Sequence, residues 1–245
     1  MPKRISFDES KVKFAKRSNF TKDRFVAFLD IMGFKDRVAR NEHDDVLEEL
    51  EIFQSNISQY VSYHRDANIQ IALFSDSILI YSQDDKLSSL HALADITSHI
   101  MMYAIQQEKP IPLKGAIAAG RMTCNQTKQL YFGQALIDAY LLEENVKYYG
   151  VLVHHSAEKY LMLSQFNEFR DVKAPLKGGE IAHYELNWYN VKLDLFKIIN
   201  GQKQPVPQKE LPICLKNLRL TVSDEPRKYI DNTKRVLETN NAQQA

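Results

Sequence analysis

Two aspartates stand where buried strands are expected to end. Asp30 ends the apolar part of RFVAFLDIMGFK (24–35), and Asp76 lies between the two strand-like halves of IQIALFSDSILIY (69–81). A carboxylate at the end of a buried strand costs free energy unless it is hydrogen-bonded, paired or bound to a metal. A lone aspartate of this kind more often only caps a turn. Two of them in one small domain favour a divalent-cation site.

The expected strand arrangement lets both carboxylates hold the same ions. Neighbouring antiparallel strands lie only about 5 Å apart, so Asp30 and Asp76 can share metals. Carboxylate oxygens suit Mg²⁺ or Mn²⁺, which accept substrate phosphates in their open positions. Two ions per site would give a two-metal phosphoryl-transfer centre. Gly33 and Phe34, in the following turn, have backbone N–H groups that can receive phosphate oxygens, although Gly33 is equally suited to a plain turn.

Apolar periodicity predicts the elements that position these residues. Continuous apolar residues indicate a central strand, three- and four-residue steps indicate helices, and alternation indicates a hairpin with Asp76 at its tip. The expected order is strand 25–31, helix 44–64, hairpin 69–81, helix 87–104, strand 113–120, short strand 130–132, helix 135–146 and strand 151–153. This order predicts an α+β sandwich, with helices packed on one face of a mostly antiparallel sheet.

Length and composition exclude several classes of protein. A chain of 245 residues with 44% hydrophobic content can bury a core, and its net charge of +1 argues against a nucleic-acid partner. No run of about 18 apolar residues and no secretory signal are visible, so we expect no membrane span and a cytoplasmic location. We expect a basic N-terminal arm (1–23), a catalytic domain (24–190) and a C-terminal extension (191–245) with a disordered tail from Thr239. The cationic N-terminal residues are Lys3, Arg4, Lys11, Lys13, Lys16, Arg17, Lys22 and Arg24.

The succession FLDIMGF, FSDSILI, LKGAIAAG and YFGQALIDAYLLE resembles the class III nucleotidyl cyclase catalytic domain, over roughly Arg24 to Ser156. The resemblance implies a ferredoxin-like sandwich. It also implies that Asp30, the carbonyl of Ile31 and Asp76 bind two Mn²⁺ or Mg²⁺ ions, with Asp30 and Asp76 as the catalytic carboxylates. Sites of this family form between two chains, so a head-to-tail homodimer is expected.

The sequence departs from the family at four positions. Purine cyclases read the base with a lysine and a polar residue where this chain has Ala72 and Leu130. The family's transition-state asparagine and arginine correspond to Ile137 and Leu141. An inactive cyclase-like domain would tolerate such losses, but it would have little reason to keep both metal aspartates.

Other residues must then bind the substrate. Ala72, Phe74, Leu130 and Phe132 are the candidates for the base pocket, and both phenylalanines have an even chance of being core residues. A cation must also offset charge at the α-phosphate. Lys114 and Arg121 flank the small-residue strand and are the candidates, against the alternatives of an exposed strand lysine and a residue that only follows a glycine turn.

The chain is similar to the bacterial pyrimidine cyclases of the Pycsar anti-phage systems. That similarity implies attack of the ribose 3′-oxygen of UTP on its own α-phosphorus, giving 3′,5′-cyclic UMP and pyrophosphate, and a protein effector that senses the product. Cytidylate cyclase is the runner-up, because the sequence does not show which exocyclic group is read. A non-catalytic nucleotide-binding module and another palm-like phosphoryl-transfer enzyme remain alternatives.

Overall fold

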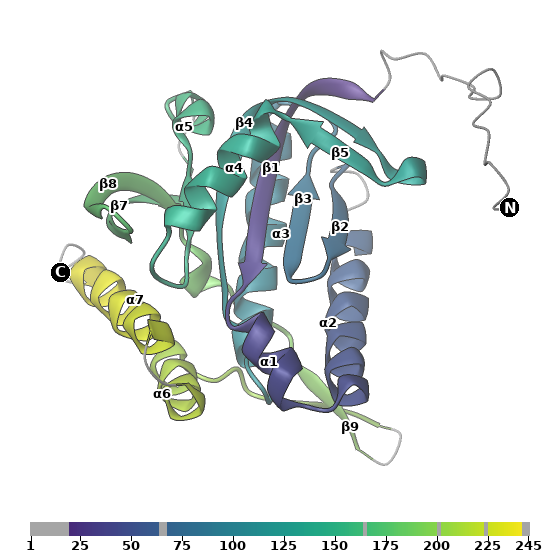
Figure 1. Ribbon diagram of the computed structural model, residues 1–245, viewed down its shortest axis with the longest axis vertical. Coiled ribbons are helices and arrows are strands. Elements are labelled where there is room, and N and C mark those ends of the chain that lie inside the picture. The colour runs from purple at the N-terminus through teal and green to yellow at the C-terminus, as the bar shows by residue number, and fades with distance from the viewer. Residues whose placement is uncertain (1–19, 64–67, 164–165, 200–201, 223–224, 242–245) are drawn as a thin grey trace, which may run out of the picture.

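The computed structural model describes residues 20–63, 68–163, 166–199, 202–222 and 225–241. Its centre is an eight-stranded sheet in the order β2-β3-β1-β4-β6-β8-β7, with β5 paired to β4 (Figure 1). All pairs are antiparallel except β4 with β6. The strands are β1 (Thr21–Ile31), β2 (Gln70–Phe74), β3 (Ser77–Tyr81), β4 (Leu113–Asn125), β5 (Leu130–Gly133), β6 (Val151–Val153), β7 (Phe169–Leu176) and β8 (Gly179–Leu186).

Helices lie on both sides of this sheet. Figure 1 shows α3 behind β1 and β3 and α4 crossing in front of β1 and β4. The described helices are α1 (Phe34–Arg40), α2 (His43–Tyr63), α3 (Leu87–Gln106), α4 (Gln134–Asn145), α5 (His155–Leu161), α6 (Leu211–Thr221) and α7 (Glu225–Asn241). None of them has the length and apolar character that a membrane crossing needs.

Alternation along β1 sends its side chains into two separate cores. Phe25, Ala27 and Leu29 belong to the large core under α2 and α3. Val26 and Phe28 belong to a smaller core under α4. Successive strand residues point to opposite faces. Asp30, which continues the second set, therefore lies on the α4 face of the sheet.

The predicted fold class is confirmed: the chain forms an α+β sandwich around a mostly antiparallel sheet. The expectation that helices pack on one face only is wrong, because α2 and α3 cover one core and α4 covers a second core on the other face. The central strand, the Asp76 hairpin and the helix after β5 all form where the pattern places them. The small-residue strand was expected to close at Gly120, but β4 continues to Asn125, because its far half still pairs with β1 and β5.

The two ends of the chain differ from expectation in detail. Residues 1–19 of the predicted basic arm and residues 242–245 of the predicted tail lie outside the described residues. Arg24, counted among the cations of the arm, is only 2% exposed and donates to the carbonyl of Ser82 at 2.8 Å. In the extension, a small hairpin of β9 (Phe196–Ile199) and β10 (Gln202–Pro205) precedes α6, and α7 packs on β7.

Candidate active site

Asp30 and Asp76 meet at one end of the β1–β3 ladder. Asp30 is the last β1 residue paired with β3, opposite Ser77, and Asp76 directly precedes Ser77 in the hairpin turn. The Ile31 N–H donates a 2.8 Å hydrogen bond to the Asp76 carbonyl oxygen. Ser75, the other turn residue, has a left-handed φ of 56°, which a two-residue hairpin turn requires. The backbone therefore fixes the two aspartates side by side.

Burial and two neighbouring charges act on the carboxyl group of Asp30. Burial raises its pKa above the usual 3.8, the Lys114 ammonium lowers it, and the neighbouring Asp76 carboxylate raises it again. Two carboxylates that repel each other in a half-buried position are stabilised by a shared cation. Their oxygens, with backbone carbonyls nearby, are the hard donors that Mg²⁺ and Mn²⁺ take, with open positions left for water or phosphate. The residues present therefore fit a divalent metal, although no group of three or more His, Cys, Asp or Glu gathers anywhere in the described ranges.

Lys114 is not the exposed strand lysine of the alternative interpretation, which is wrong. It is 6% exposed, and its ammonium lies 2.5 Å from the Glu143 carboxylate and donates to the Glu143 carbonyl at 2.9 Å. Glu143 is itself only 3% exposed and was missed from the sequence. A signal was present, because Ala135, Ala139 and Glu143 recur every four residues and so share the buried side of α4. An acid in such a row needs a cation.

The turn after β1 has an exposed backbone that a phosphate group could approach closely. Gly33 is exposed, has a left-handed φ of 73°, and an added Cβ would meet nothing within 4 Å. Phe34 begins α1 and packs its half-buried ring against the large core. Their part in receiving phosphates stays a prediction.

Most of the residues predicted for the base pocket are exposed on the surface of the single chain. Ala72 is half-buried against the smaller core. Phe74, Leu130 and Phe132 are 46%, 50% and 60% exposed, so the interpretation of the two phenylalanines as core residues is wrong. Tyr131, between the last two, points inward and packs near Tyr81. The outward row of β5 is thus apolar and uncovered.

Arg121 lies away from the two aspartates of its own chain. It pairs with Asp23, whereas Lys114 pairs with Asp30, seven positions away along the same ladder. At about 3.3 Å per residue this separation is roughly 23 Å. The exposed Arg121 therefore lies far from Asp30 in its own chain. Alternation along β4 also places it on the side of Ile117 and Ala119, which is the face of the sheet opposite to Asp30.

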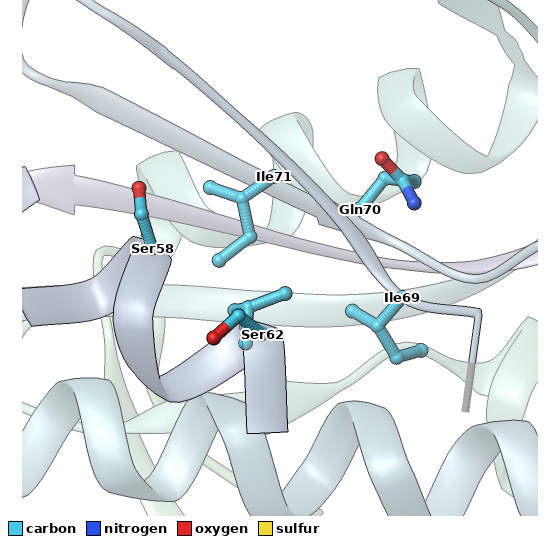
Figure 2. A pocket seen from close by; sticks show the side chains of 6 residues that line it. Ser58, Ser62, Ile69, Gln70 and Ile71 are labelled. Atoms are coloured by element: carbon cyan, nitrogen blue, oxygen red, sulfur yellow. The ribbon is translucent and has the colours of Figure 1, made fainter. Parts of the chain in front are cut away.

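The two described cavities lie on the opposite face of the sheet. The smaller, of about 310 Å³, lies between α2 and the start of β2 (Figure 2). Figure 2 shows Ile69 and Ile71 pointing toward α2 while Gln70 points away. The larger, of about 640 Å³, lies between α2, α3 and residues 192–195. Neither belongs to the Asp30 site, which opens on the α4 face.

No family model and no curated protein matches the sequence. Solved structures do match. The catalytic core of a rhodopsin-guanylyl cyclase with converted specificity, in complex with ATPαS, is 13% identical with a TM-score of 0.55, over 67% of this chain and 94% of that one. The guanylate cyclase domain from Catenaria anguillulae, in complex with GTP, is 12% identical with a TM-score of 0.53, over 68% and 96%. The monomeric guanylyl cyclase domain from Blastocladiella emersonii is 14% identical with a TM-score of 0.54, over 68% and 95%.

The chain has the class III nucleotidyl cyclase fold. At identities this low the similarity concerns the fold alone, and function has to be argued from the site. The predicted ferredoxin-like cyclase sandwich is thereby confirmed.

Proposed function

We propose that the protein is a nucleotidyl cyclase that converts UTP to 3′,5′-cyclic UMP and pyrophosphate. The observation that carries this proposal is the fixed pair of Asp30 and Asp76, joined through the Ile31 to Asp76 backbone hydrogen bond, on a cyclase fold. The Asp30 carboxylate is half-buried beside a second carboxylate, and its raised pKa means that its ionised form destabilises the folded protein. Carboxylates with such a cost cluster at functional sites. The presence of Asp30 at this edge of this sheet supports catalysis.

Asp30, Asp76 and the carbonyl of Ile31 would hold two Mn²⁺ or Mg²⁺ ions. When bound, such ions supply Lewis-acid stabilisation to the ribose 3′-oxygen and to the triphosphate charge. The exposed turn at Gly33 and Phe34 receives the β- and γ-phosphates. The 3′-oxygen then forms a bond to the α-phosphorus, the bond to the bridging oxygen of pyrophosphate breaks, and the hydroxyl proton passes to water. Positioning of the reacting groups and electrostatic stabilisation of the transition state account for most of the catalysis of such a reaction.

The choice of a pyrimidine follows from what the base positions lack. Ala72 and Leu130 have no hydrogen-bonding side chains where purine cyclases of this fold carry polar ones. A site without those groups loses the contacts that would favour a purine. We place UTP first and CTP second. Second-messenger synthesis in anti-phage defence, with a product-sensing effector protein, is the biological role that the Pycsar similarity supports.

A head-to-tail homodimer completes this site. The exposed face of α4 carries Ile137, Tyr140 and Leu141, at the three- and four-residue steps of one helix face. An apolar helix face is stable in water only when something covers it. In a head-to-tail pair, the base pocket of one protomer would face the aspartates of its partner.

The test is incubation of the purified protein with each of the four nucleoside triphosphates and Mn²⁺, with products resolved by mass. We expect a cyclic pyrimidine monophosphate from the wild type and none from Asp76→Asn. Asp171→Asn is the matched control, because Asp171 is an exposed aspartate on β7, at the far edge of the sheet.

Other outcomes would select an alternative. Binding of a nucleotide without turnover in any metal would favour the non-catalytic module. A linear or dinucleotide product would favour another palm-like phosphoryl-transfer enzyme. Cyclic CMP in place of cyclic UMP would leave the mechanism intact and change the base.

A further inference from the structure

Three charged side chains lie between the sheet and α4: Asp30 of β1, Lys114 of β4 and Glu143 of α4. Asp30 and Lys114 are direct partners in the antiparallel β1–β4 ladder. Both continue the sets of alternating residues, with Val26 and Ala118 among them, that form the core under α4. Side chains directly opposite each other on one face have Cβ atoms about 5 Å apart. The Lys114 ammonium is thus within reach of the Asp30 carboxylate.

Lys114 nevertheless pairs with Glu143 and not with Asp30. In the described part of the chain, its ammonium forms its ion pair with Glu143 of α4 and is held a second time by the Glu143 main-chain carbonyl. Asp30 forms no ion pair with it there. Both members of the Lys114–Glu143 pair are buried, so the lysine cannot exchange its partner for water. A buried charge that loses its partner must find another, because leaving it unpaired is strongly unfavourable.

We propose that Glu143 is a positioning residue that keeps the Lys114 ammonium off Asp30 and so leaves the Asp30 oxygens free for a divalent cation. With Glu143 in place, Asp30, Asp76 and Glu143 outnumber the single ammonium by two negative charges. Without it, the freed ammonium has Asp30 as its nearest acid across the ladder. It would then occupy the oxygens that the cation needs.

The effect is expected on metal affinity rather than on the reaction at full occupancy. Removing a residue that orients a ligand from behind usually weakens metal binding about 10- to 100-fold. Glu143→Gln should therefore weaken Mn²⁺ binding by about that factor, while turnover at saturating Mn²⁺ stays within about threefold of the wild type. Glu143→Asp, which keeps the charge, should restore most of the affinity.

The measurement is an electron paramagnetic resonance titration of Mn²⁺ against the full chain, without nucleotide. The deciding variant is Lys114→Met combined with Glu143→Gln, since no ammonium then remains to compete. We expect the double variant to bind Mn²⁺ within about threefold of the wild type, tighter than Glu143→Gln alone. Glu144→Gln removes the same charge from the adjacent position of α4 and should leave the affinity unchanged.

Several results would overturn the inference. They are an unchanged affinity in Glu143→Gln, a double variant as weak as the single one, or no Mn²⁺ binding by the wild type. If Glu143→Gln does not fold, the double variant decides, and a tenfold loss in it would count against the role. The inference rests on the proposed function, but the two fail separately: a wild type that binds Mn²⁺ without cyclising any nucleotide loses only the function.

Discussion

Asp30 carries a cost to folding stability that its proposed role as a metal ligand would explain. Its pKa is raised in the folded chain, chiefly by burial, so the ionised carboxylate opposes folding. That penalty is absent below the ordinary aspartate pKa of 3.8 and grows as the pH rises through the raised value in the folded protein. Metal-free protein at neutral pH therefore carries a penalty that a bound cation would relieve.

Asp30→Asn should remove the penalty together with the activity. At pH 7 in EDTA we expect the variant to melt about 2 °C above the wild type, because the buried charge is gone. Near pH 3.5 the difference should be much smaller, since the wild-type carboxyl is then mostly protonated in both states. Thermal melts at the two pH values check this. A gain of equal size at both, or a lower melting temperature at pH 7, would contradict it.

Glu185 is a buried carboxylate that, in contrast to Asp30, is stabilised by hydrogen bonds from side chains of its own chain. It is fully buried and accepts hydrogen bonds from the Tyr148 and Tyr189 hydroxyls, each at 2.7 Å, and from Arg170 Nε at 2.6 Å. Four groups, from the segment before β6, from β7, from β8 and from the turn after β8, thus converge in one network. Its role is to join the far half of the sheet.

Truncating Glu185 should be severe, because it leaves Arg170 as an unpaired, largely buried cation. We expect Glu185→Ala to lower the free energy of unfolding by about 3–5 kcal/mol. Urea unfolding measures this, with Glu180→Ala as the comparison, since Glu180 is an exposed glutamate of the same strand. Equal losses in the two variants would show that burial of the network is not what stabilises this region.

At the scale of elements, the sequence predicts those strands and helices that the pattern of their own residues determines. The apolar run before Asp30 and the alternation around Asp76 each identify a strand from its own residues, and both strands form as expected. The Lys114–Glu143 pair could not be predicted in this way. It depends on how α4 lies across β4, a tertiary arrangement that neither residue's neighbours in sequence reveal. Arg24 was misinterpreted for the same reason, since only the β1–β3 pairing brings the Ser82 carbonyl to it.

The junction of β5 and α4 depends on one glycine. Gly133 has φ of 149°, and an added Cβ would lie 2.4 Å from the Arg121 carbonyl oxygen and 2.6 Å from Met122 Cα. Backbone atoms at those distances cannot yield as a flexible side chain can. Gly133→Ala should therefore cost about 2 kcal/mol or more of folding stability and displace β5 from β4.

Thermal and urea unfolding of Gly133→Ala measure that cost. Gly178→Ala is the matched control, because an added Cβ there meets nothing within 4 Å. The control should stay within about 0.5 kcal/mol of the wild type. A Gly133→Ala protein as stable as the control would show that β5 is not fixed by this close approach.

At the scale of the whole molecule, the proposed homodimer would divide each site between two chains. The aspartates lie at one end of the β1–β4 ladder, and Arg121 lies at the other. Phe132 and Leu130 are exposed, as is the apolar face of α4. Local sequence patterns identified the aspartates, Arg121 and the β5 residues as candidates. Their separation within one chain follows only from the strand register. A two-fold arrangement that brings the aspartates of each chain against the exposed apolar residues of β5 and α4 of its partner would cover those residues.

Mixing two inactive variants tests this arrangement. Asp30→Asn damages the metal half and Phe132→Glu the pocket half, so each homodimer lacks activity at both sites. Each mixed dimer pairs one intact metal half with one intact pocket half, and random exchange should restore about a quarter of the wild-type rate. Asp30→Asn mixed with Asp76→Asn should restore nothing, because both variants damage the same half. If native mass spectrometry shows mixed dimers and the rate stays at zero, the site is built within one chain, and the exposed apolar face of α4 must be covered by something other than a second catalytic half.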